Sequence, residues 1–181
     1  MNLRLITAPT VEPVSLETTK SFLRVDGTDN DPTIMMLMAA AREKGEELAR
    51  RAFITQTWDM TVDCWTVDLR LKVYRPPLQS VVSVKYLDRS NVEHTFSDYV
   101  VDTRNEPGVI IFNSLPGAAL LESGAITVRF EAGFGDAGVN VPERIKKNIL
   151  ALTAYWFENR EAQDVPGDLK KAFIAERVVW F

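Results

Sequence analysis

The chain has 181 residues, of which 46% are hydrophobic and 25% are charged, and its formal net charge is −4. These values are typical of a soluble globular protein and exclude a disordered chain, whose apolar content would be lower. They also argue against a general nucleic-acid binder, which would carry a basic surplus. A chain of this length can bury a core without disulfides or a metal ion, so we expect a single domain over residues 1–181.

The cysteine content and the apolar runs indicate where the protein is made. Cys64 is the only cysteine, so no internal disulfide can form and a reducing compartment is expected. Residues 1–13 contain no apolar run of signal-peptide length, and no segment approaches the about 20 apolar residues of a membrane span. We therefore expect a cytoplasmic protein without a membrane partner.

Residues 14–53 are predicted to form the N-terminal helices. Ser15 can cap a short helix, with Glu17 placed favourably in the first turn. An acidic turn at 26–31 follows. Turn formation and helix capping explain it better than a calcium loop, because the twelfth position of such a loop would be Leu37 and not glutamate.

A second, longer helix is predicted after this turn. Asp31 can cap it, with Pro32 at the first helical position. The solvent face is expected to carry ion pairs at i,i+4 spacing, such as Glu46 with Arg50. The opposite face should be buried, because small or apolar residues recur there at helical spacing over about five turns. These residues are Ile34, Leu37, Met38, Ala41, Gly45, Leu48 and Ala52.

Residues 55–132 change to the period of two that is typical of β-strands. In QTWDMTVDC, polar residues alternate with Trp58, Met60, Val62 and Cys64, which predicts a half-buried strand. Turn residues separate further short strands at residues 69–73 and at SVVSVKYLD, VEHTF, YVVD, GVIIF and AITVRF. Many short strands with close turns predict a β-rich lobe, built as an antiparallel sheet or as a small sandwich or barrel.

Residues 142–181 return to helical spacing. Pro142 should open a helix that places Ile145, Ile149, Leu152 and Trp156 on one face, and Asp168 can cap a last helix. The fold class expected for the whole chain is therefore α+β. The N- and C-terminal helices would pack together as a helical body, with the central antiparallel β-rich region projecting as a lobe.

A glycine-rich segment joins the last strand to the helix at Pro142. Gly133, Gly135 and Gly138 suggest a phosphate-binding loop at first sight, but no Lys-Ser or Lys-Thr pair follows them. A dinucleotide-binding loop is also disfavoured, because the preceding strand belongs to an antiparallel meander and not to a βαβ unit. We interpret the segment as a tight strand-to-helix connection.

The residues that could carry catalysis or bind a metal ion are few. His94 lies in an alternating strand, and Cys64 is expected to be a packed core cysteine. A structural zinc site normally needs four histidine or cysteine ligands, which the chain does not have. We expect no catalytic residue, no cofactor and no metal site.

The C-terminal end is unusually apolar, because its last residues are Val178, Val179, Trp180 and Phe181. A chain end is normally frayed and polar. These side chains could dock on the chain's own core. Alternatively, they could anchor in a pocket of a partner, since aromatic residues dominate binding hot spots.

The sequence resembles the head–tail connector, or adaptor, proteins of long-tailed phages, prophages and gene transfer agents. The resemblance runs over nearly the whole chain. It rests on the order and spacing of LITAPTVEPVSLETTKSFLRVD, DNDPTIMMLMAAAREKGEELARRAFITQTW, RPPLQSVVSVKYLD and VRFEAGFGDAGVNVPERIKKNILALTAYWFENRE. It implies a structural protein rather than an enzyme.

The resemblance also implies partners and a location. Such adaptors form a homo-oligomeric ring, twelve-fold in the particle, beneath the portal protein, and they are assembled in the bacterial cytoplasm. The ring lies in the neck of the virion or phage-like particle. It extends the channel through which double-stranded DNA passes without sequence-specific binding, and it offers a surface to a stopper or tail-completion protein.

The family pattern assigns tasks to parts of this chain. The C-terminal segment of related adaptors contacts the portal, so Val178, Val179, Trp180 and Phe181 become candidate portal-binding residues. Trp65 and Tyr74 are candidates for the subunit interface, because a ring requires each copy to offer two different surfaces. The alternatives are a small ligand-binding domain or enzyme with a pocket in the β-rich lobe, and an interaction domain of a non-viral assembly.

Overall fold

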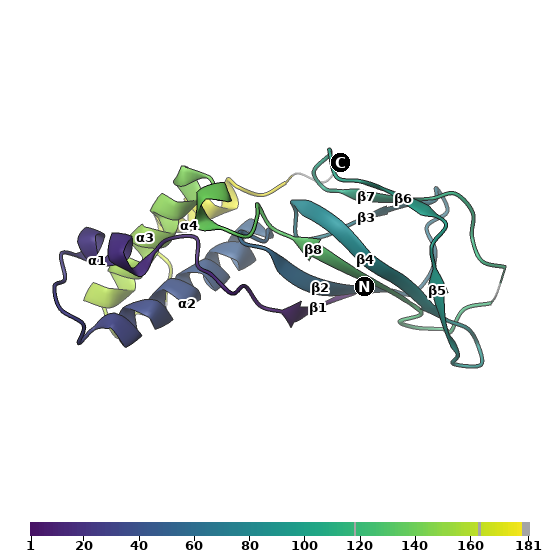
Figure 1. Cartoon of the computed structure of the whole chain (residues 1–181), viewed down its shortest axis with the longest axis horizontal. Helices are drawn as coiled ribbons and strands as arrows, with labels where there is room; N and C mark the ends of the chain where they lie inside the picture. Colours follow the sequence, from purple (N-terminus) through teal and green to yellow (C-terminus); the bar gives the residue numbers. More distant parts are fainter. Residues whose placement is uncertain (118, 163, 179–181) are drawn as a thin grey trace. The chain divides into compact units, whose positions relative to one another are not determined.

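The structure is a computed structural model, and it describes residues 1–117, 119–162 and 164–178. The chain forms two compact units (Figure 1). A β-rich unit comprises Met1–Ala8 and Thr55–Gly133, and a helical unit comprises Pro9–Ile54 and the described residues from Phe134 onward. The expected α+β class with a central antiparallel β-rich region is therefore confirmed.

Four α-helices of the described chain build the helical unit. They are α1 (Leu16–Leu23), α2 (Asp31–Ala49), α3 (Glu143–Glu158) and α4 (Gly167–Ile174), and a short 3₁₀ helix, η1 (Gly138–Asn140), precedes α3. None of these helices combines the length and the apolar character that crossing a membrane requires. Ser15 caps α1 as predicted, because its side-chain oxygen accepts a hydrogen bond from the backbone N–H of Thr18 at 3.1 Å.

The predicted caps of α2 and α4 are wrong. The N-cap of α2 is Asn30, and Asp31 is already the first helical residue, with its carboxylate 2.7 Å from Lys20 Nζ. Asp168 likewise lies inside the first turn of α4, which follows Pro166. In both places the acidic side chain still sits beside the positive end of the helix dipole, which is why the sequence signal is similar.

The core of the helical unit lies where α2, α3 and α4 meet. The predicted apolar stripe of α2 faces this core, and Gly45 lies within it: a Cβ atom at Gly45 would be 2.6 Å from Cε1 of Phe173 and 2.9 Å from Cε2 of Phe53. The rings of Phe53 and Phe173 are stacked with centroids 6.3 Å apart. Other core residues are Val14, Ala41, Leu48, Ala49, Ile54, Val141, Ile145, Ile149 and Leu152.

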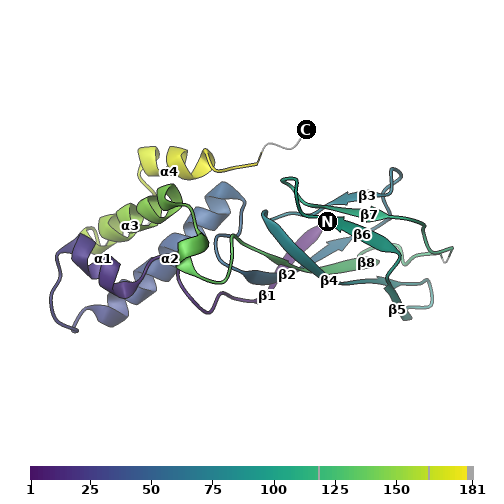
Figure 2. The same cartoon turned by 45° about the horizontal axis from the view of Figure 1, so that its top comes forward.

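The β-rich unit contains two antiparallel sheets that pack on each other (Figure 2). A five-stranded sheet has the order β1-β2-β8-β4-β5, and a three-stranded sheet has the order β3-β7-β6. The strands are β1 (Asn2–Thr7), β2 (Gln56–Val62), β3 (Arg70–Lys72), β4 (Leu78–Leu87), β5 (Glu93–Phe96), β6 (Tyr99–Asp102), β7 (Val109–Phe112) and β8 (Ile126–Ala132). All were expected except β1, whose partner β2 is distant in the sequence.

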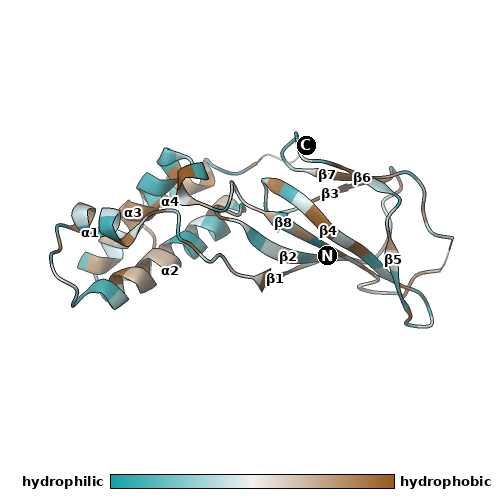
Figure 3. Ribbon diagram, in the orientation of Figure 1, coloured by the Kyte–Doolittle hydropathy of each residue, from teal (hydrophilic) through white to brown (hydrophobic). Residues whose placement is uncertain are grey.

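Side chains alternate between the two faces of the five-stranded sheet. Met60, Val128 and Val84 lie in register across β2, β8 and β4, and all three are fully buried. Apolar residues also line much of β7 in the facing sheet (Figure 3). Phe96 of β5 meets Phe112 of β7 edge-on at 5.9 Å, so the sheets share one core.

The other face of this sheet carries a cross-strand ion pair. Arg4, Asp59 and Arg129 lie in register on β1, β2 and β8. Arg129 donates two hydrogen bonds of 2.8 Å to the two carboxylate oxygens of Asp59. These hydrogen bonds from Arg129 are the main cause that holds the pKa of Asp59 below its ordinary value of 3.8.

Replacing Asp59 with asparagine is expected to lower the stability of the β-rich unit in a pH-dependent way. Because the folded-state pKa of Asp59 is depressed, its contribution is fully present above pH 3.8 and is lost as the pH falls through the folded value. The gap between the wild type and Asp59→Asn should therefore be widest near neutral pH and should close in acid. Urea unfolding followed by tryptophan fluorescence measures this gap, and a constant gap at every pH would contradict the assignment.

The glycine-rich segment is a strand-to-helix connection, as predicted. It leads from β8 through η1 into α3, with Gly133 and Gly135 at φ angles of 138° and 151°. Gly138 lies against the chain before α1: a Cβ atom there would be 2.5 Å from the backbone oxygen of Pro13. The glycines therefore serve backbone conformation and close packing.

Candidate interaction surfaces

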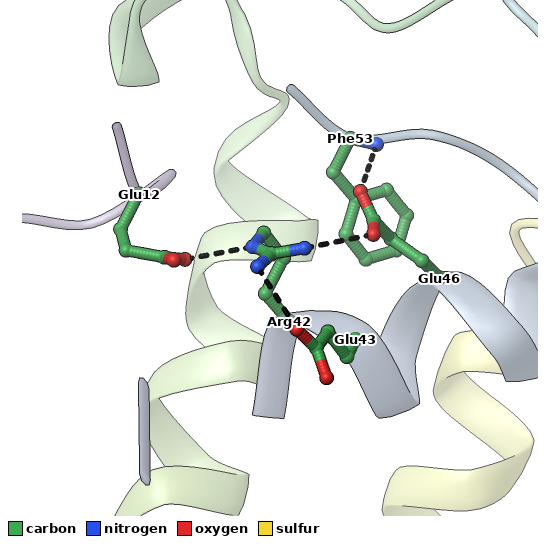
Figure 4. A network of polar contacts seen from close by, with 5 residues as sticks. All are labelled: Glu12, Arg42, Glu43, Glu46 and Phe53. Carbon is green, nitrogen blue, oxygen red and sulfur yellow. Dashed lines mark hydrogen bonds and ion pairs between the residues drawn. The ribbon is translucent and has the colours of Figure 1, made fainter. Parts of the chain in front are cut away.

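A buried arginine organises the N-terminal half of the helical unit (Figure 4). Arg42 of α2 is 5% exposed, and its guanidinium contacts Glu12 at 2.9 Å, Glu46 at 3.0 Å and Glu43 at 3.5 Å. The second carboxylate oxygen of Glu46 accepts a hydrogen bond from the backbone N–H of Phe53 at 2.7 Å. This network ties the segment before α1 and the segment after α2 to the same helix.

The location of Glu46 corrects one expectation. The sequence predicted Glu46 on the solvent face of α2, but its side chain is only 7% exposed and pairs with Arg42. Burial by itself would lower the pKa of Arg42, yet the carboxylates of Glu46 and Glu12 outweigh it and raise this pKa. Burial also raises the pKa of Glu12, against the opposing effect of Arg42. The arrangement is that of a structural ion-pair network.

The predicted portal-binding end is described only as far as Val178, which is half-buried. Val179, Trp180 and Phe181 lie outside the described residues. Just before Val178, the chain is attached to the helical unit at two consecutive residues. The buried carboxylate of Glu176 lies 2.6 Å from Nε of Arg144, and Nε of Arg177 donates to the backbone oxygen of Leu48 at 2.7 Å.

The two predicted subunit-interface residues lie in the β-rich unit. Trp65 is half-buried and packs on the rings of Tyr86, Phe96 and Phe112, with centroids 5.1 to 5.9 Å apart. Its indole Nε1 is buried and has no hydrogen-bond partner within the described part of the chain. Tyr74 is also half-buried, between β3 and β4. The interface role of both residues stays a prediction.

His94 and Cys64 lie in different surroundings. His94 Nε2 lies 2.8 Å from Asp88 Oδ2, and its ring stacks on Tyr86 at 5.0 Å. Cys64 is exposed, which corrects the expectation of a core cysteine: β2 already ends at Val62, so the alternation no longer applies two residues later. Within residues 1–117, 119–162 and 164–178, no cluster of histidine, cysteine and acidic residues could hold a metal ion.

A solvent-open cavity of about 590 Å³ lies in the helical unit. Its walls come from the segment before α1, from η1, from the first turn of α1 and from the N-terminal half of α3. Lys146 and Lys147 line it beside the carboxylates of Glu12 and Glu143. His94 and Cys64 are not among its walls. The cavity therefore does not lie in the β-rich lobe, where the enzyme alternative placed its pocket.

Both units also expose large apolar side chains that sequence patterns alone did not single out. Phe22, Met35 and Met36 of α1 and α2 are 51%, 50% and 63% exposed. Val67 in the loop after β2 is fully exposed. Because helical spacing marks only the buried stripe, it gives no information about apolar residues on the opposite face.

The fold is similar to that of chains in three solved structures of gene transfer agent (GTA) particles. The first is the neck of an empty GTA particle computed with C6 symmetry, with a TM-score of 0.80 and 19% sequence identity. The second is the virion of a native GTA particle, with a TM-score of 0.81 and 18% identity. The third is the neck of a native GTA particle computed with C12 symmetry, with a TM-score of 0.76 and 19% identity. Each alignment covers 100% of this chain and 97% of the other.

Sequence comparison adds the family. No curated protein matches the chain significantly. The head completion protein family, in contrast, matches residues 12–167, which include α1, α2, α3, the first residue of α4 and the strands from β2 to β8. That match covers most of the chain, and the family is one of structural proteins and not of enzymes. The chain therefore belongs to the head completion protein family.

Proposed function

We propose that this protein is a head–tail adaptor that forms a ring in the neck of a virion or phage-like particle, between the portal and the tail. The observation that carries the proposal is the match to the head completion protein family over residues 12–167. The likeness in fold to chains from GTA neck structures computed with C6 and C12 symmetry supports the ring. In this proposal the ring is twelve-fold, and its copies assemble in the bacterial cytoplasm.

The ring would use different parts of one connector domain for different contacts. The connector domain of each copy comprises the N-terminal helices at 14–53, the β-rich lobe at 55–132, and the C-terminal helices with the docking end at 142–181. Closed rings are built from heterologous contacts, in which one surface of a copy meets a different surface of the next. Trp65 and Tyr74 are proposed for the contact between copies. The apolar side chains that are exposed on both units are further candidates for contacts between copies.

The portal, a stopper or tail-completion protein, and the passing DNA would be the remaining partners. The aromatic end, Val178–Phe181, is proposed to anchor in the portal. The net charge of −4 disfavours tight binding of DNA phosphates, so double-stranded DNA would pass through the channel without sequence-specific binding.

Removal of residues 178–181 is expected to abolish attachment to the portal while leaving the fold intact. The truncation leaves α4 and the core contacts of Phe173 in place. Electron microscopy of the protein mixed with the portal protein of the same particle would detect attachment, and circular dichroism would report the fold. Val139→Ser is a matched control, because Val139 is an apolar residue that is 84% exposed and lies outside the C-terminal end. Normal attachment of the truncated protein would refute the role of the C-terminal end.

A further inference from the structure

The last described residues of the chain return to the C-terminal end of α2. The C-cap residue after this helix, Arg50, has a left-handed conformation, and the backbone N–H groups of Arg50 and Arg51 donate hydrogen bonds to the carbonyls of Glu47 and Glu46. Carbonyls in the last turn of a helix lack partners inside the helix. The carbonyl of Leu48 is in that turn, and it accepts a hydrogen bond from Nε of Arg177 at 2.7 Å. A cation at this end of α2 is also favoured by the helix dipole.

The neighbouring residue, Glu176, is attached from two further directions. Its carboxylate is 7% exposed and lies 2.6 Å from Nε of Arg144 in α3. Its backbone carbonyl accepts a hydrogen bond from Nε of Arg51, just after α2. Two consecutive residues, Glu176 and Arg177, are therefore held by three guanidinium groups. These belong to Arg144 of α3, to Arg51 just after α2 and to Arg177 itself.

We propose that Arg51, Arg144 and Arg177 form a clamp that fixes the point at which the C-terminal end leaves the helical unit, and so positions that end for the portal. This inference rests on the proposed function, because it assumes that the residues after the clamp dock on the portal. The three arginines are positioning residues and do not themselves contact the portal.

Positioning should increase affinity for a physical reason. A flexible segment loses conformational entropy for each residue that becomes ordered on binding, and fixing the segment beforehand removes part of this loss. The proposed docking residues begin directly after Arg177. A shift of Arg177 would therefore also shift the start of the docking segment.

The first test inserts two glycines between Arg177 and Val178. This insertion keeps the clamp and the docking residues, and it changes only their spacing and freedom. We expect the affinity for the portal protein of the same particle to fall about tenfold, with an unchanged melting curve. Unchanged affinity would overturn the clamp, because a tail that needs no fixed starting point would tolerate the extension.

The second test replaces Arg177. Arg177→Ala should weaken portal binding by about the same factor, while Arg177→Lys, which keeps a cationic donor near Leu48, should retain most of it. Amide hydrogen exchange should show lost protection at residues 176–178 only, with α2 and α3 unchanged. Lys171→Ala is the matched control, because Lys171 is a cation on α4 whose side chain is 83% exposed. Equal binding by Arg177→Ala and the wild type would overturn the clamp.

The results of the truncation, the glycine insertion and Arg177→Ala together distinguish the clamp from the docking of the C-terminal end. If removal of residues 178–181 abolishes portal binding but the glycine insertion and Arg177→Ala have no effect, the C-terminal end docks without the clamp. If the removal itself has no effect, both the docking role and the clamp are refuted. If Arg177→Ala also lowers the melting temperature, the glycine insertion decides, since it leaves every contact of Arg177 in place.

Discussion

Arg42→Ala is expected to lower the free energy of unfolding of the helical unit by about 3–5 kcal/mol. The substitution removes one partner of a buried ion pair, so the carboxylate of Glu46, which is 7% exposed, loses the guanidinium of Arg42. It also removes the contact of Glu12 with α2. Urea unfolding followed by far-ultraviolet circular dichroism measures the change, because the α-helices dominate that signal.

The same helix offers a matched control two residues further along. Lys44 pairs with Glu47 at 2.8 Å, but both side chains are well exposed, at 38% and 64%. Lys44→Ala should therefore cost no more than about 1 kcal/mol. Similar losses for Arg42→Ala and Lys44→Ala would contradict the proposed role of burial.

The effect of Arg42→Ala should also depend on pH, and its sign follows from Glu12. Burial already raises the pKa of Glu12 above its ordinary value of 4.5, and Arg42 is the group that opposes this rise. Without Arg42, the folded state favours the protonated carboxyl still more strongly. A raised folded-state pKa contributes stability at low pH that is lost as the pH rises. The deficit of the variant should therefore be largest near neutral pH and smaller toward pH 4.5.

Local patterns in the sequence were sufficient for most of the secondary structure. The buried stripe of α2 and the strands from β2 to β8 follow from spacing alone, because one side of each element faces a core. The strand β1 was missed because its assignment depends on pairing with β2, across more than 50 residues. The ion pair of Asp59 could not be predicted for a similar reason. Alternation places Asp59 on the polar face of β2, but it does not show that Arg129 on the neighbouring strand β8 pairs with it.

The candidate surfaces were less predictable for the same reason. Glu46 has cations on both sides along α2, and helical spacing cannot decide between a buried pair with Arg42 and an exposed one with Arg50. The N–H of Phe53, beyond the end of the helix, contributes to that choice. The contact between Arg177 and Leu48 spans 129 residues of sequence, so no local pattern could indicate it. The sequence indicated an apolar C-terminal segment but not the contacts of Glu176 and Arg177 that precede it.

Phe173→Ala is expected to destabilise the helical unit by about 3–5 kcal/mol and, under the proposed docking of the C-terminal end, to weaken attachment to the portal. Phe173 is fully buried, and its ring stacks on Phe53 above the space that Gly45 leaves open. Removing this ring leaves a cavity between α2 and α4 that the rigid helices cannot close. Because α4 carries the chain to Arg177, a loosened α4 should release the C-terminal segment.

Phe22→Ala is the matched control for this prediction, since it removes the same ring from a position that is 51% exposed on α1. It should change the free energy of unfolding by less than about 0.5 kcal/mol, the range of surface substitutions. Urea unfolding of both variants, together with hydrogen exchange in α4, tests the comparison. Equal stability losses would mean that the stacked pair is not a centre of the core. Full protection of α4 in Phe173→Ala would mean that α4 is held by contacts other than this ring, and portal attachment should then survive the substitution.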